Sequence, residues 1–127
     1  MAITPFADSP RNGAWGDRPY AIIDWAGPAS YVQVVNGSGN PLTLPTGGQA
    51  ISSTNFGLTA GLEGIDCIGG SQSGTYGVEA FQASAYNQGL GNLNWILRWT
   101  VNATGAEVTA GVNLALEIVR LRAFGPY

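Results

Sequence analysis

Residues 93–101, LNWILRWTV, alternate strictly between the two sides of an extended chain. One side carries Leu93, Trp95, Leu97, Trp99 and Val101, and the other carries Asn94, Ile96, Arg98 and Thr100. Successive side chains leave a strand on opposite sides, so this period-two pattern is typical of a β-strand with one face in a core. On this strand, Trp95 and Trp99 are expected to be core residues rather than a platform for a ligand.

The last long segment, LEIVRLRAF (116–124), alternates as well. Val119, Leu121 and Ala123 share one side, and Ile118, Arg120, Arg122 and Phe124 share the other. A helix over ALEIVRLRA is the competing interpretation. The alternation and the β-branched pair Ile118–Val119 favour a strand.

The remaining chain consists of short strand-like segments between turn clusters, and no long helical pattern is present. The 19 glycines and 7 prolines support such a turn-rich organisation. We expect strands at 30–35, 64–69 and 75–82 and at the end of 44–52, turns or loops at 36–41, 69–74 and 85–92, and one helical turn within 52–59 that Gly57 ends. The expected fold is all-β, an antiparallel β-sandwich or jelly-roll.

Residues 1–28 differ from the rest and predict an extended N-terminal arm, followed by a sandwich domain over residues 29–127. Four prolines interrupt any helix there, while the aromatic and aliphatic side chains are too apolar for a solvated tail. The arm is expected to lie on its own domain or on a neighbouring subunit. Phe6, Trp15, Tyr20 and Trp25 are its candidate contact residues.

The charges argue against several kinds of partner. All five cations are arginine, and with eight acids the net charge is −3. Such a chain lacks the basic footprint that nucleic acid or an anionic membrane requires, and no apolar run is long enough to span a bilayer. Arginine suits ion pairs within an interface, which makes Arg120 and Arg122 candidate contacts, although chance and codon bias explain an arginine-only set equally well.

Few residues could carry catalysis or hold a metal. The chain has no histidine and no lysine, and its one cysteine, Cys67, lies in the apolar run GIDCIG and is expected to be a small buried hydrophobe. No secretory signal opens the chain, so we expect a protein made in the cytoplasm of its host. We therefore expect no catalytic residue, no metal and no cofactor.

Carboxylates leave two other possibilities open. A glycosidase pair could come from Glu63, Asp66, Glu79, Glu107 and Glu117, and a calcium site from Asp8, Asp17 and Asp24. No motif positions the first group, and the spacing of the second matches no calcium loop. Solvated or ion-paired acids are the favoured interpretation.

Four stretches carry a resemblance to a known class of proteins. They are LTLPTGGQAISSTNFGLT (42–59), GIDCIGG (64–70), SGTY (73–76) and TGAEVTAGVNLALEIVRLRAFG (104–125). Over roughly residues 30–125 the chain resembles head decoration, or cement, proteins of tailed bacteriophages. The arm is not covered.

The resemblance implies a structural virion protein on the capsid surface that bridges neighbouring major capsid subunits as a homo-oligomer, with a trimer favoured. A tail or head-fibre component with a similar module stays open. So does a carbohydrate-binding module, which would use exposed tryptophans.

Overall fold

The computed structural model describes residues 4–5, 12–15, 18–35, 45–58, 61–83 and 94–125, with side chains from Tyr20 onward. It contains strands and one short 3₁₀ helix in this part of the chain. The elements are β1 (Thr4–Pro5), β2 (Asn12–Trp15), β3 (Arg18–Ala26), β4 (Gln49–Ser52), η1 (Ser53–Phe56), β5 (Gly64–Cys67), β6 (Tyr76–Gln82), β7 (Asn94–Val101) and β8 (Ile118–Phe124). The fold is all-β, as the sequence predicts.

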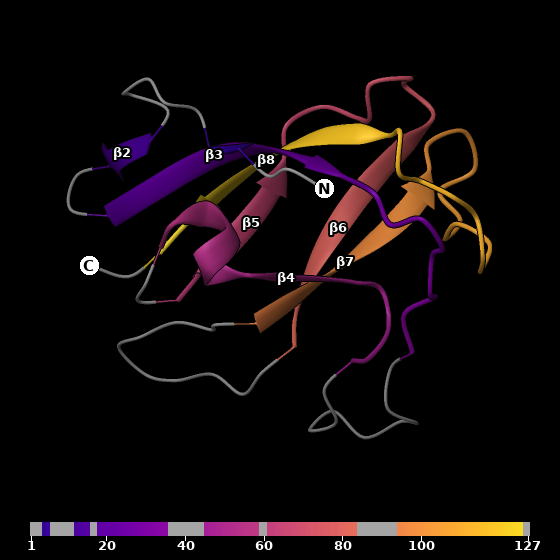
Figure 1. Cartoon of the computed structure of the whole chain (residues 1–127), viewed down its shortest axis with the longest axis horizontal. Coiled ribbons are helices and arrows are strands. Elements are labelled where there is room, and N and C mark those ends of the chain that lie inside the picture. Colours follow the sequence, from indigo (N-terminus) through magenta and orange to yellow (C-terminus); the bar gives the residue numbers. More distant parts are fainter. Residues whose placement is uncertain are drawn as a thin grey trace.

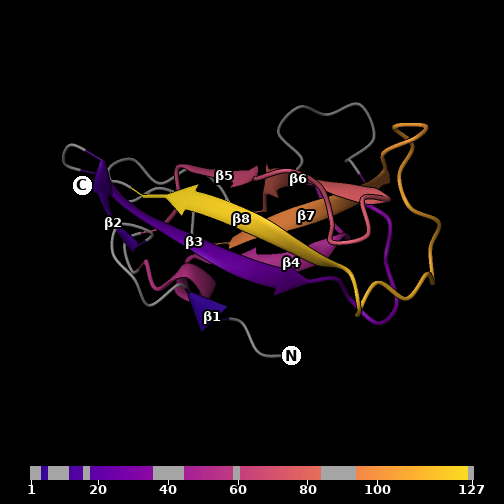
Figure 2. The same ribbon diagram turned by 90° about the horizontal axis from the view of Figure 1, so that it is seen from above.

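The strands form two antiparallel sheets. The larger sheet has the order β1-β3-β8-β5, with β2 also paired to β3, and the smaller sheet has the order β4-β7-β6. The sheets face each other as a β-sandwich (Figures 1 and 2). The jelly-roll form of this expectation is not confirmed, because a jelly-roll has eight strands in two Greek keys, whereas the smaller sheet has three described strands.

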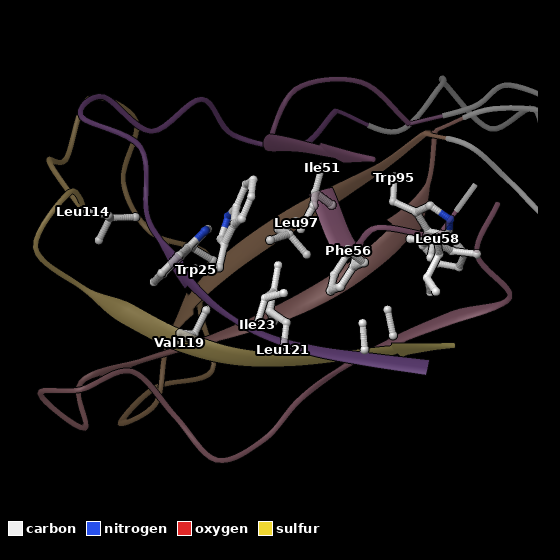
Figure 3. Packing of buried hydrophobic residues seen from close by; sticks show 14 of the residues in the cluster. Ile23, Trp25, Ile51, Phe56, Leu58, Trp95, Leu97, Leu114, Val119 and Leu121 are labelled. Atoms are coloured by element: carbon white, nitrogen blue, oxygen red, sulfur yellow. The ribbon is translucent and has the colours of Figure 1, made fainter. Parts of the chain in front are cut away.

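The core lies between the two sheets and follows the predicted alternation. Trp95 and Leu97 of β7 face Ile23, Val119 and Leu121 of the other sheet (Figure 3). These residues are buried, and Trp99 belongs to the same buried cluster. Trp95 and Trp99 are therefore core residues, as expected. Ile96 on the opposite side of β7 is also buried, beside the β-carbon position of Gly48, so the outer side of this strand is covered in part.

One polar side chain connects the two sheets through the core. The amide of Gln49 in β4 accepts a hydrogen bond from Trp99 Nε1 at 2.9 Å and donates one to the carbonyl of Ala26, at the end of β3, at 2.8 Å. The Gln49 amide and the Trp99 indole N–H thereby keep hydrogen-bond partners at a partly buried position, so this link costs little desolvation energy.

The helical turn expected within 52–59 is η1, and it closes one end of the core. The backbone N–H of Ser52 donates to Asn55 Oδ1 at 2.8 Å, and Gly57 ends the turn in the left-handed region at φ 74°. Phe56 is fully buried, and Figure 3 shows it between the residues of the two sheets. The local capping signals therefore predicted this element.

The extended arm expected over residues 1–28 is not confirmed. Residues 18–26 form β3, which pairs with β8 from Tyr20 to Ala26 and sends Ala21, Ile23 and Trp25 into the core. The boundary expected at residue 28 therefore falls inside the sandwich. The prolines that suggested an arm are compatible with a strand, because Pro19 lies near its beginning and Pro28 beyond its end.

The strand expected at 30–35 is wrong. This segment is extended, but only Val35 forms a bridge, to Thr46. Its other backbone hydrogen bonds go to several places. Gly48 N–H donates to the carbonyl of Val32, Tyr31 pairs with the backbone at residues 111 and 112, and Val34 N–H donates to the side chain of Glu107. Without one continuous neighbour, β-branched residues do not make a ladder.

The expectations for residues 64–69, for Cys67 and for two loops have the following outcomes. The segment at 64–69 is a strand over 64–67, in which Asp66 is exposed and the other three residues are half-buried. Among the described strands only β8 pairs with it. Cys67 is likewise half-buried; burial raises the pKa of its thiol, which donates to the carbonyl of Gly69 at 3.0 Å. The turn at 36–41 and the loop at 85–92 lie outside the described residues.

Candidate contact surface

The side of the larger sheet that faces away from the core gathers three of the six predicted contact residues. We call it the outer face; it comprises Tyr20, Ile22, Asp24, Asp66, Ile68, Ile118, Arg120, Arg122 and Phe124. The register places Tyr20 opposite Phe124, Ile22 opposite Arg122, and Asp24 opposite Arg120. Because alternate residues of a strand share a side, the buried set on β3 and β8 leaves these residues on the other side.

Two cross-strand ion pairs cross the outer face. Arg120 contacts Asp24 through Nε–Oδ1 at 2.9 Å and Nη2–Oδ2 at 3.4 Å, and Arg122 Nη2 contacts Asp66 Oδ2 at 3.0 Å. The hydrogen bond to Asp24 raises the pKa of Arg120. In each pair the positive charge of the arginine cancels the negative charge of the aspartate, so the residues that define the outer face carry no net charge.

Apolar side chains surround these ion pairs. Tyr20, Ile22, Ile118 and Phe124 are half-buried, and Ile68 keeps 42% of its surface exposed. Ile68 continues the pairing of β5 with β8, because its backbone N–H donates to the carbonyl of Arg120 at 2.7 Å. A mixture of aromatic, aliphatic and arginine side chains is the composition that recurs at protein–protein interfaces.

The structure separates the predicted contact residues into three groups. Tyr20, Arg120 and Arg122 lie together on the outer face. Trp25 points to the opposite side and is only 5% exposed, so in this chain it packs in the core; its Nε1 has no hydrogen-bond partner among the described residues. Trp15 ends β2 opposite Arg18, and its side chain is outside the description, as is all of Phe6.

Sequence reasoning missed the acids and aliphatic residues of this face. The sequence suggests Asp24 only as a calcium ligand and Asp66 only as a member of a catalytic pair. A signal was present, because RPYAIIDWA (18–26) alternates Tyr20, Ile22 and Asp24 with Ala21, Ile23 and Trp25. The proline-rich surroundings obscured it.

Glu79 and Glu107 are occupied by contacts within the fold. Glu107 Oε2 accepts hydrogen bonds from Tyr31 Oη at 2.8 Å and from Val34 N–H at 2.7 Å, and its Oε1 lies 3.9 Å from Arg98 Nε. Arg98 also contacts Glu79, with 3.5 Å between Nη1 and Oε2. Arg98 therefore contacts two of the five carboxylates that the sequence offered as candidates for a catalytic pair.

The hydroxyl of Tyr31 is buried and connects β7 to the loop that precedes β8. It accepts a hydrogen bond from Trp99 N–H at 3.1 Å and donates to Glu107. Burial, followed by the hydrogen bond to Glu107, raises the pKa of Tyr31. The hydroxyl thus stays neutral and acts as a fixed structural group.

The described residues show neither a metal cluster nor a membrane-spanning helix. Within the residues that the structure places, no three histidine, cysteine or acidic side chains lie close enough to share a metal ion. No helix in the same residues is long and apolar enough to cross a membrane. Comparison with protein-family models, with curated proteins and with solved structures gave no match to this chain.

Proposed function

We propose that the chain is a structural virion protein that decorates the outside of a tailed-phage capsid and bridges neighbouring major capsid subunits. The observation that supports it most is the outer face, where two cross-strand ion pairs lie among half-buried apolar side chains. Such a face can bury apolar area against a partner without leaving an unpaired charge in the interface.

The mechanism is adhesion, with no catalytic step and no cofactor. A specific protein interface buries about 800 Å² on each partner. A single contact made by one sheet face is expected to supply only a modest affinity. A homo-oligomer, with a trimer favoured, presents several such faces together, and the linked contacts raise the overall affinity. The protein is made in the host cytoplasm and resides on the capsid surface.

The copy number of the chain in purified particles tests the proposal. We expect quantitative mass spectrometry to find this chain and the major capsid protein in a ratio near one or a simple fraction. A few copies per particle would instead support the alternative, a tail or head-fibre component. Absence from the particles would reject both.

A binding experiment tests the surface itself. Purified protein is added to undecorated heads, and the bound fraction is measured by sedimentation. Ile68→Asp places a charge in the outer face and is expected to reduce binding at least tenfold. Val35→Asp is the matched control, because Val35 is also an exposed β-branched hydrophobe but lies outside the outer face, on the segment bridged to Thr46. Equal binding by both variants would reject the outer face as the contact.

A further inference from the structure

A shallow hollow lies between the turn that follows β5 and the segment that precedes β8. It is lined by Gln72, Ser73, Tyr76, Asn113, Leu116 and Glu117. None of these residues is in the outer-face set, but Gln72 also lines the neighbouring hollow, beside Asp24 and Arg120. Its lining combines two amides, two hydroxyls, one carboxylate, one aromatic ring and one aliphatic side chain.

Hydrogen bonds within the fold hold the two walls together. Ser73 Oγ donates to Glu117 Oε1 at 2.5 Å, and the backbone N–H of Gln72 donates to the carbonyl of Ile118 at 2.8 Å. The floor is supported as well, because the ring of Tyr76 packs edge to face on buried Trp99 with centroids 6.5 Å apart. The hollow is therefore preformed, which lowers the entropic cost of binding.

Several polar groups of the lining have no hydrogen-bond partner among the described residues. They are the side-chain amide of Gln72, the hydroxyl of Tyr76, Nδ2 of Asn113 and Oε2 of Glu117. Asn113 is already oriented, because its Oδ1 accepts a hydrogen bond from Ala115 N–H at 2.9 Å. The set offers donors and acceptors within one small concave area, which is how small-molecule sites fix the orientation of a ligand.

We propose that this hollow binds one neutral saccharide unit. Sugar hydroxyls both donate and accept, so they match amides and a carboxylate, and the C–H face of a sugar ring can pack on Tyr76 or on Leu116, which is 91% exposed. No cation lines the hollow, and Glu117 repels an anionic ligand. Arg120 lines the adjacent hollow and is paired with Asp24.

A titration of the isolated full chain tests this inference independently of any capsid contact. Two-dimensional NMR follows backbone and side-chain amides while methyl glycosides of glucose, galactose, mannose and N-acetylglucosamine are added one at a time. We expect at least one of them to give saturable shifts at the six lining residues, with a Kd on the order of 1 mM. Gln72→Ala should weaken that binding roughly three- to tenfold, the value of one lost neutral hydrogen bond.

Two variants and one charged probe separate the possible outcomes. Gln82→Ala is the matched control, an exposed glutamine on β6 outside the hollow, and should leave the Kd unchanged. Glu117→Gln should keep saccharide binding within about tenfold. The inference is overturned by the absence of saturable shifts up to 100 mM, by equal losses in Gln72→Ala and Gln82→Ala, or by binding of glucosamine alone that disappears in Glu117→Gln.

Discussion

Arg120 of β8 and Asp24 of β3 form a two-point ion pair across adjacent strands, with Nε 2.9 Å from Oδ1 and Nη2 3.4 Å from Oδ2. The register places the two residues directly opposite each other. Side by side on one face of a sheet, such a pair fixes where both charges lie without pulling either into the core. The pair therefore lies on the outer face, which we propose as the contact surface.

Arg120→Ala should separate the surface role of this pair from stability. The two side chains are 49% and 43% exposed, and exposed ion pairs stabilise folds only weakly, so the melting temperature is expected to change by less than about 4 °C. Binding to undecorated heads should nevertheless fall several-fold. A large drop in melting temperature would show that the pair supports the fold instead.

Tyr31→Phe should destabilise the protein, because it removes one hydroxyl from a buried network. Trp99 N–H loses its acceptor and Glu107 loses a donor. An unsatisfied buried polar group costs about 1–3 kcal/mol of unfolding free energy, which urea denaturation measures directly. Tyr76→Phe is the control, because the Tyr76 hydroxyl has no hydrogen-bond partner among the described residues, and it should change the unfolding free energy by less than about 0.5 kcal/mol.

The raised pKa of Tyr31 makes stability depend on alkaline pH. Below about pH 10, the ordinary tyrosine value, the hydroxyl is neutral in the folded and unfolded states and its contribution is complete. As pH rises above this value, the unfolded chain ionises first and stability is lost. We expect the gap in unfolding free energy between the wild type and Tyr31→Phe to narrow between pH 9.5 and 11; parallel curves would contradict the assignment.

Gly27→Ala should destabilise the connection after β3. A β-carbon at residue 27 would lie 2.4 Å from Cβ of Leu114 and 2.6 Å from its carbonyl oxygen, where the backbones are also joined by the bond from Leu114 N–H to Pro28. Overpacking of this kind costs about 1–3 kcal/mol, measurable by urea denaturation. Ala29→Ser, at an exposed position nearby, is the control and should leave the unfolding free energy unchanged. Equal losses in both variants would show that the segment is sensitive to any substitution and would contradict the proposed clash.

Local pattern by itself determined the elements with strong periodicity or capping signals. The alternation in 93–101 and 116–124 predicted β7 and β8 to within two residues at either end, and it assigned Leu97, Trp99 and Leu121 to the core. Ser52 and Gly57 bounded the helical turn. These predictions succeed because the pleat of a strand and the cap of a helix depend on residues adjacent in sequence.

Only the tertiary structure decided which segments become neighbours. SYVQVV has the composition of a strand. Its hydrogen bonds go to three different places, however, and the segment does not form a strand. Residues 18–26 looked like part of an arm, yet pairing with β8 makes them a central strand. Asp24 and Arg120, 96 residues apart, meet because of that pairing. Strand order and register depend on which distant surfaces bury each other best. The periodicity of one segment does not identify the strand with which it pairs.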